Sequence, residues 1–320
     1  MKIVFMGTPE FAIPSLKILL QSNHKIVAVV SAPDKERGRG KQISSTPVKN
    51  FALENNLKVL TPISLKDEKF IQRLKELEPD LFIVVAFRIL PKDVYTIPAK
   101  GSFNLHGSLL PKYRGAAPIQ WSIINGETET GVTTFFLEDK VDTGNIIIQE
   151  KIKIDDEDDF GSLHDKMMIV GANVVLQTVE LIEKGNFVPS KQNDSIASPA
   201  PKITKEICKI DWEKSDVGIH NLVRGLSPHP GAYFEHKGKT YKVFKTRMVE
   251  SSQWSIVSGQ LNIKSNTTNN SQPSTFKIYQ TKKEIYVTTG NGTLQILELQ
   301  AEGRKRMTAE EFLRGHSLIE

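Results

Sequence analysis

The stretch NLHGSLLPKYRGAAPIQW, residues 104 to 121, contains the side chains of this sequence that are best placed to do chemistry. Asn104 and His106 lie two positions apart beside the apolar residues Phe103 and Leu105. In an extended strand, residues i and i+2 project from the same face. The spacing therefore brings an amide and an imidazole, two groups suited to hydrogen bonding and proton transfer, to one small site.

Turn-forming residues follow the pair and place it at or near a strand end, where open α/β sheets hold their ligands. These residues are Gly107, Ser108, Pro111 and Gly115. Asp142, in the turn sequence LEDKVDTGNII, is the candidate for a third partner. A carboxylate there can orient an imidazole and tune it electrostatically, as in general acid–base sites. An isolated Asn-x-His pair is more often structural, so the neighbouring motifs must decide.

Strand and helix patterns alternate in the first part of the sequence. The run 81–87 is apolar almost throughout, as expected for a central parallel strand that is covered on both faces. Strands that alternate with helices imply a doubly wound, Rossmann-like, mostly parallel sheet. The predicted strands are Lys2–Met6, Lys25–Val30, Lys58–Leu60, Leu81–Phe87, Val132–Leu137 and Ile146–Ile154, and the predicted helices are Pro9–Leu20, Pro47–Asn55, Asp67–Glu78 and Leu163–Ile182.

The composition changes to proline and small polar residues between Val188 and Thr204, which indicates a link between domains. Beyond it, a helix that Ser215 can cap runs to about Leu226, and several short strands in succession suggest a small OB-like β-barrel. These strands are Tyr241–Val249, Ile256–Ile263, Phe276–Gln280, Ile285–Thr289 and Leu294–Leu299. The predicted division is a Rossmann-like catalytic domain over 1–189, a link over 190–206 and a barrel domain over 207–320.

The overall composition is that of an ordinary soluble protein, with 320 residues of which 39% are hydrophobic and 25% charged. A formal charge of +5 mildly favours an anionic partner such as nucleic acid. Cys208 is the single cysteine, so an intrachain disulfide is excluded and nothing points to an oxidising compartment. The first residues are broken too soon by Gly7 and Pro9 for a signal peptide, and no apolar run approaches the roughly 20 residues of a membrane span. We therefore expect a cytoplasmic protein without a membrane segment.

A cationic segment, APDKERGRGKQISSTP, occupies residues 32–47. It carries Lys35, Arg37, Arg39 and Lys41, with glycines between them, which predicts a flexible loop. In an arbitrary protein such a stretch is more often a solvated loop than a binding element. Cationic side chains on a mobile loop also suit contacts to phosphate groups.

Other site classes find little support. The turn after the first strand lacks the GxGxxG spacing and the following acid of a dinucleotide site, which argues against NAD binding. The seven histidines show no metal-ligand spacing, so we predict no metal. The acidic run Asp155–Asp159 is predicted to cap the helix that follows it, with a metal site as the less favoured alternative.

The motifs taken together resemble the methionyl-tRNA formyltransferase family. They are GTPEFA at 7–12, SLLPKYRGAAPIQW behind Asn104 and His106, VDTGNII at 141–147, KIDW at 209–212 and QILELQAEGRKRMTAEEFL at 295–313. The resemblance covers nearly the whole chain. The shorter form of SLLPxYRGAAP is shared with other 10-formyltetrahydrofolate enzymes, whereas the AAP ending and the second domain favour the tRNA branch.

The resemblance implies transfer of a formyl group from 10-formyltetrahydrofolate to the amino group of initiator methionyl-tRNA, in support of translation initiation. Nothing in the sequence demands more than a monomer. Three sets of residues match the family. They are the catalytic triad Asn104, His106 and Asp142, the folate-binding residues Ser108, Leu109, Leu110, Pro111, Phe87, Ile89 and Leu90, and the acceptor-stem loop residues Arg37, Arg39 and Lys41. The stretch AFRILP at 86–91 is one residue shorter than the family form AYGxILP.

The implied chemistry agrees with the residue types. Transfer of a formyl group from N10 to a primary amine passes through a tetrahedral intermediate whose oxygen becomes negative. Donors from Asn104 and His106 would stabilise that oxygen. Asp142 would hold and tune His106 and assist proton transfer from the attacking ammonium to the leaving N10. No covalent enzyme intermediate is required.

Two rival hypotheses stay open. The same chemistry would serve a small acceptor, such as an amino sugar nucleotide, or water in a deformylating hydrolase, but neither requires the cationic loop or the second domain. A non-catalytic RNA-binding module on an α/β scaffold is the other alternative. The joint presence of Asn104, His106 and Asp142 argues against it.

Overall fold

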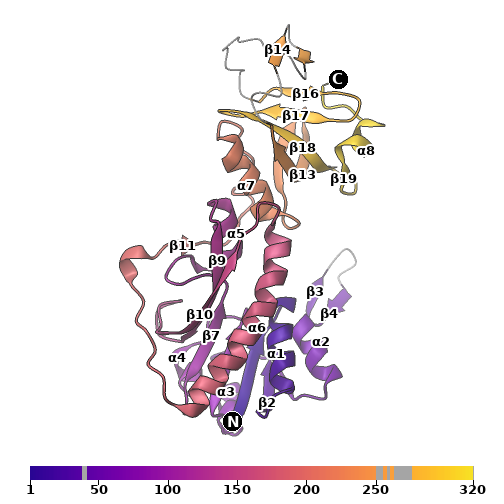
Figure 1. Cartoon of the computed structure of the whole chain (residues 1–320). Coiled ribbons are helices and arrows are strands. Elements are labelled where there is room, and N and C mark those ends of the chain that lie inside the picture. The colour runs from indigo at the N-terminus through magenta and orange to yellow at the C-terminus, as the bar shows by residue number, and fades with distance from the viewer. Residues whose placement is uncertain (38–41, 250–254, 258–259, 263–275, 320) are drawn as a thin grey trace. The chain divides into compact units, whose positions relative to one another are not determined.

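A computed structural model describes the chain from residue 1 to 319 with gaps at 38–41, 250–254, 258–259 and 263–275 (Figure 1). Two compact units make up the described chain. The first comprises Met1–Pro118, Glu129–Lys153 and Leu163–Pro201, and the second comprises Ile119–Thr128, Ile154–Ser162 and Lys202–Glu320.

These units differ from the division expected along the sequence. Residues 119–128 and 154–162 belong to the C-terminal unit, although they lie within the predicted domain 1–189. Residues 190–201, expected to be part of a link, belong to the N-terminal unit. Contacts between residues far apart in sequence produce both differences, and composition along the chain does not report such contacts.

A seven-stranded sheet forms the centre of the N-terminal unit, in the order β10-β9-β7-β6-β1-β2-β5. Its strands are β1 (Lys2–Gly7), β2 (Lys25–Val30), β5 (Val59–Leu60), β6 (Leu81–Val85), β7 (Ser102–His106), β9 (Glu129–Phe136) and β10 (Ile146–Lys153). The pairs β5–β2, β2–β1, β1–β6 and β6–β7 are parallel. Strand β9 pairs antiparallel with both β7 and β10. The predicted Rossmann-like, mostly parallel sheet is confirmed.

Helices cover both faces of this sheet. They are α1 (Ile13–Leu20), α2 (Pro47–Glu54), α3 (Glu68–Lys75), the short α4 (Lys92–Tyr95) and α6 (Phe160–Lys184), and a 3-10 turn (Glu10–Ala12) precedes α1. Val4 and Met6 of β1 share a buried cluster with Phe70 of α3. On the other face, a Cβ added to Gly171 of α6 would lie 2.8 Å from Leu105 of β7, so this helix packs its backbone directly on the strand.

Local capping explains where several helices begin. Thr46 accepts a hydrogen bond from the backbone N–H of Lys49 at the start of α2, and Asp67 caps α3 in the same manner. At α6, the Asp159 carboxylate accepts the backbone N–H of Ser162 at 2.9 Å. The predicted capping role of the acidic run is confirmed for Asp159.

Several short elements lie outside the large sheet. β3 (Lys35–Arg37) and β4 (Gln42–Ser44) pair antiparallel within the segment that was expected to be a loop. β8 (Arg114–Gly115) pairs in parallel with β11 (Pro199–Ala200), and a 3-10 turn, η2, spans Asp194–Ile196. The helix α5 (Pro118–Ile124) begins at the boundary of the two units.

An antiparallel sheet in the order β12-β13-β18-β17-β16, with β19 beside β18, forms the C-terminal unit together with two helices. The elements are α7 (Asp216–Leu226), β12 (Ala232–His236), β13 (Lys239–Met248), β16 (Ile278–Gln280), β17 (Ile285–Thr288), β18 (Thr293–Ala301), β19 (Met307–Thr308) and α8 (Ala309–Leu313). Ser215 caps α7 as predicted. The expected strand 256–263 is instead a pair, β14 (Ser255–Val257) and β15 (Gln260–Asn262). The half-barrel sheet bears out the OB-like expectation.

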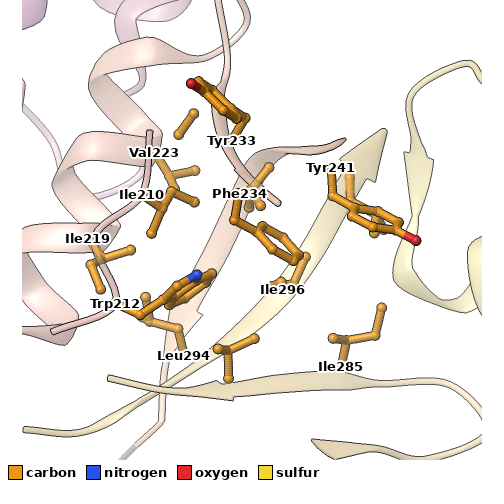
Figure 2. Packing of buried hydrophobic residues seen from close by; sticks show 14 of the residues in the cluster. Ile210, Trp212, Ile219, Val223, Tyr233, Phe234, Tyr241, Ile285, Leu294 and Ile296 are labelled. Atoms are coloured by element: carbon orange, nitrogen blue, oxygen red, sulfur yellow. The ribbon is translucent and has the colours of Figure 1, made fainter. Parts of the chain in front are cut away.

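Aromatic and branched side chains fill the core of this unit (Figure 2). The Trp212 and Phe234 rings meet edge to face with centroids 5.5 Å apart, and Phe234 stacks on Tyr241 at 5.4 Å. Ile219 and Val223 of α7 close one side of the cluster (Figure 2). No helix in the described ranges is long and apolar enough to cross a lipid bilayer.

Candidate active site at the end of strand β7

The site is built on β7, a strand flanked by parallel β6 and antiparallel β9. Asn104 lies beside Val84 of β6 and Phe135 of β9, and His106 is two residues further along the same face. Asn104 is half-buried and lines a cavity of about 100 Å³. Its side-chain amide has no hydrogen-bond partner within the described part of the chain, so its donors and acceptor are available to a ligand.

His106 is 6% exposed and is held by its Nε2 atom, which lies 2.8 Å from the carbonyl oxygen of Tyr113. Because a carbonyl oxygen can only accept, Nε2 carries the hydrogen. The ring also meets Phe135 edge to face at a centroid distance of 6.4 Å. Its other nitrogen, Nδ1, lies 3.8 Å from Oδ2 of Asp142. Nδ1 is therefore the ring nitrogen of His106 that can hydrogen-bond to a ligand.

The Asp142 turn has an unusual backbone. Asp142 has φ +56°, in the left-handed region that few non-glycine residues occupy. The backbone N–H of Gly115 donates to Asp142 Oδ2 at 2.8 Å, and the Asp142 side chain is 12% exposed. A Cβ at Gly144 would collide with the carbonyl oxygen of Phe136, so the return of the turn to the sheet requires glycine.

The loop after β7 is fastened to β9 and β10 by two polar side chains. Thr133 Oγ1 donates to the Ser108 carbonyl at 2.6 Å and accepts the Leu110 N–H at 3.2 Å. Gln149 Nε2 donates to the Leu110 carbonyl at 2.8 Å. Neither Thr133 nor Gln149 was predicted as a site residue, because on the sequence each is one polar residue within a strand.

The cavity brings five of the predicted residues together, namely Phe87, Ile89, Leu90, Asn104 and Asp142. Apolar side chains and a few polar groups share its wall, a composition typical of sites for small organic ligands. The cavity lining does not include His106, which faces Asp142, nor the segment 108–111, which lies in the fastened loop.

Arg88 is a further residue of the cavity wall that sequence reasoning passed over. Its Nη1 and Nη2 donate to the carbonyl oxygens of Ile63 and Pro62 at 3.0 and 2.8 Å, and its guanidinium lies 5.2 Å from the Phe87 ring centroid. Burial lowers the pKa of Arg88. The arginine lies in the stretch AFRILP, where this chain departs from the family form, and that departure was the available signal.

At the rim of the cavity, Tyr95 donates a hydrogen bond to Asp139 at 2.6 Å. This bond raises the pKa of Tyr95 to about 12, and it lowers the pKa of Asp139 together with a hydrogen bond from Lys92. The rim therefore carries a fixed carboxylate and a neutral phenol at ordinary pH.

The predicted cationic loop is described only in part. Arg37 ends β3, whereas Arg39 and Lys41 lie outside the described residues. At the base of the segment, Lys49 pairs with Asp34 at 2.7 Å and lowers the pKa of that carboxyl.

Some basic residues of the C-terminal unit form ion pairs within that unit. Lys245 pairs with Glu157 at 3.1 Å, and Arg306 pairs with Glu298 at 2.6 Å while lying over the Phe244 ring. Among the described residues, no group of three or more histidine, cysteine, aspartate or glutamate side chains is arranged to hold a metal ion.

Comparison with known proteins gives consistent matches over the chain. A formyl transferase family model matches residues 1–179, and a model of the formyl transferase C-terminal domain matches 202–317. A methionyl-tRNA formyltransferase of Caldanaerobacter subterraneus subsp. tengcongensis is 44% identical over 322 residues, covering 100% of this chain and 98% of the relative. One from Flavobacterium johnsoniae is 46% identical over 320 residues, covering 98% and 96%.

The chain belongs to the methionyl-tRNA formyltransferase family. The family resemblance of the sequence motifs is thereby confirmed, and the protein is an enzyme that transfers a formyl group. An N-formyltransferase from Helicobacter canadensis, solved with folinic acid and dTDP-3-aminofucose, has the same fold, with a TM-score of 0.64 at 22% identity. That alignment covers 96% of this chain and 100% of the other. For this formyltransferase, the cavity beside Asn104 and Asp142 is the candidate active site.

Proposed function

We propose that this protein transfers the formyl group of 10-formyltetrahydrofolate to the amino group of the methionyl moiety of initiator methionyl-tRNA, and so supports translation initiation. Full-length similarity to methionyl-tRNA formyltransferases supports the acceptor. The observation that carries the proposal is the meeting of Asn104, which has no protein partner in the described chain, with the His106 and Asp142 pair at one strand end.

The proposed chemistry follows from the donors of the site. The amine nitrogen attacks the formyl carbon, and the carbonyl oxygen becomes an oxyanion. The Asn104 amide donates to that oxygen. His106 can donate to it only through Nδ1, because Nε2 is engaged with the Tyr113 carbonyl. The Asp142 carboxylate, 3.8 Å from Nδ1, holds the ring in this orientation.

Asp142 also has a role in proton transfer. When the oxyanion collapses, the bond between the formyl carbon and N10 breaks, and the attacking nitrogen loses a proton that N10 gains. A carboxylate beside the reacting atoms moves this proton directly or through one water. The Asp142 side chain, 12% exposed and held by the Gly115 N–H, is the group in reach.

The cosubstrate is assigned to the cavity and the loop beside it. Phe87, Ile89 and Leu90 supply an apolar wall for the flat ring system, and Asn104 lies beside the group to be transferred. The loop residues are Ser108, Leu109, Leu110 and Pro111, the segment that matches the folate-binding motif. Solved folate-bound proteins of the same fold support a folate-derived donor.

The tRNA is assigned to the cationic residues Arg37, Arg39 and Lys41 and to the C-terminal unit. Arginine and lysine contacts to phosphate groups position a nucleic acid without reading its sequence. We assign the catalytic role to a monomer, with no membrane partner and no metal.

The test is formylation of charged initiator and elongator methionyl-tRNA from 10-formyltetrahydrofolate by the wild-type protein and by His106→Ala. Removal of one oxyanion donor lowers kcat by about 100- to 1,000-fold in other enzymes, and we expect a loss of that size. Formylation of the initiator alone, lost in the variant, would support both acceptor and site. Absence of formylation on either tRNA would overturn the proposal and direct the assay to small amines.

A further inference from the structure

The segment 187–200 lies between the regions that the two family models match, and on the sequence it reads as a link. In the N-terminal unit it returns to the candidate site. Phe187 stacks on Phe136 at 6.3 Å, and Ser190 exchanges two backbone hydrogen bonds of 2.8 Å with Ile146. Its end pairs with the loop after β7 through β8 and β11.

Gln192 is the residue of this segment that reaches the Asp142 turn. It is 6% exposed, and its Nε2 donates to the carbonyl oxygens of Asp142 at 2.9 Å and of Gly144 at 2.8 Å. Its Oε1 accepts from Nε and Nη2 of Arg114, at 3.1 and 2.7 Å. The buried amide therefore uses both of its hydrogens and its oxygen, each on a group at the site.

Arg114 and its neighbour Gly115 act on the same turn from the other side. The Arg114 guanidinium also pairs with Asp194 at 2.7 Å, and this contact lowers the pKa of Asp194. The N–H of Gly115 holds the Asp142 carboxylate. One dipeptide thus orients Gln192 through its side chain and Asp142 through its backbone.

We infer that Gln192 is a positioning residue for Asp142, and that the segment 187–200 is part of the active site. The inference rests on the proposed function, because it takes Asp142 to act in formyl transfer. In this turn Asp142 has a left-handed backbone conformation, and the Gln192 amide binds the carbonyl oxygens of Asp142 and Gly144. Without that amide the turn relaxes, and a misplacement of about 1 Å at a catalytic group costs on the order of 100-fold in rate.

Two variants remove the donors in different ways. Gln192→Met removes all side-chain hydrogen bonds of residue 192 with a side chain of similar size. Gln192→Glu keeps an acceptor for Arg114 but cannot donate to the carbonyl oxygens of Asp142 and Gly144. For both we expect kcat to fall about 100-fold, with KM for methionyl-tRNA and for 10-formyltetrahydrofolate within about twofold. Gln72→Met is the matched control, because Gln72 lies exposed on helix α3, outside the candidate site, and its replacement should leave kcat unchanged.

Melting temperatures separate positioning from a purely structural role. A structural residue would lower the melting temperature while the folded fraction kept its kcat. Unchanged kcat in the folded Gln192→Glu and Gln192→Met proteins would overturn the inference.

A double-variant cycle tests whether the effect passes through Asp142. Single-turnover rates with enzyme in excess are measured for Asp142→Asn, Gln192→Met and the double variant. If Gln192 acts by placing Asp142, the double variant is about as slow as Asp142→Asn alone. A rate loss in the double variant equal to the product of the two single losses would overturn the inference. An Asp142→Asn protein with wild-type rate would instead contradict the proposed function of Asp142, so the two failures are distinguishable.

Discussion

At the scale of single residues, the site depends on which nitrogen of His106 faces the chemistry. Nε2 is bound to the Tyr113 carbonyl and Nδ1 faces Asp142. An asparagine amide nitrogen lies near the place of Nδ1, and a glutamine amide nitrogen near that of Nε2. We expect His106→Asn to retain more formyl transfer than His106→Gln, and His106→Gln to retain more stability. Single-turnover rates and urea midpoints measure the two effects, and a glutamine variant faster than the asparagine variant would contradict the assignment.

At the scale of elements, the turn between β9 and β10 decides where Asp142 lies. A Cβ at Gly144 would meet the Phe136 carbonyl, a backbone atom that cannot swing away as a side chain does. We expect Gly144→Ala to lower the free energy of unfolding by about 1 to 3 kcal/mol, and to lower kcat because the turn must shift. Urea unfolding and formylation assays check both. Gly315→Ala is the control, since nothing lies within 4 Å of its added Cβ, and an equal loss there would refute the argument.

At the scale of the whole molecule, the C-terminal unit includes two segments from earlier in the chain. Arg224 Nη1 donates to the carbonyl oxygens of Asp155, Asp156 and Asp158 at 2.9 to 3.3 Å, and Ile124 packs against the core of the unit. A fragment of residues 202–320 leaves the half-buried guanidinium without these acceptors and exposes apolar surface. We therefore expect the fragment to unfold at a lower urea concentration than the same unit in the full chain.

Tryptophan fluorescence follows the unfolding of this unit in the full chain. The ranges of the N-terminal unit contain no tryptophan, because the three tryptophans are at positions 121, 212 and 254, so the fluorescence of the full chain does not come from that unit. Circular dichroism follows the fragment, which lacks the tryptophan of α5. A fragment with the same urea midpoint as the full chain would show that the two early segments do not stabilise the unit.

The sequence by itself determined the features that depend on neighbours along the chain. Strand periodicity placed Asn104 and His106 on one face, because side chains alternate with a period of two residues. Apolar runs and turn residues located most strands of the large sheet, and capping residues such as Ser215 and Asp159 marked helix starts. The motif around residue 108 indicated the family, since a long pattern rarely arises by chance.

Only the tertiary structure decided the features that depend on residues far apart in sequence. It selected Nδ1 of His106 as the atom that faces Asp142, since the Tyr113 carbonyl occupies Nε2. It brought Gln192 back to a turn 50 residues earlier, and it assigned residues 154–162 to the C-terminal unit. Hydrogen bonds and packing between distant segments fix these features, because each buried polar group must find a partner in space wherever that partner lies in the sequence.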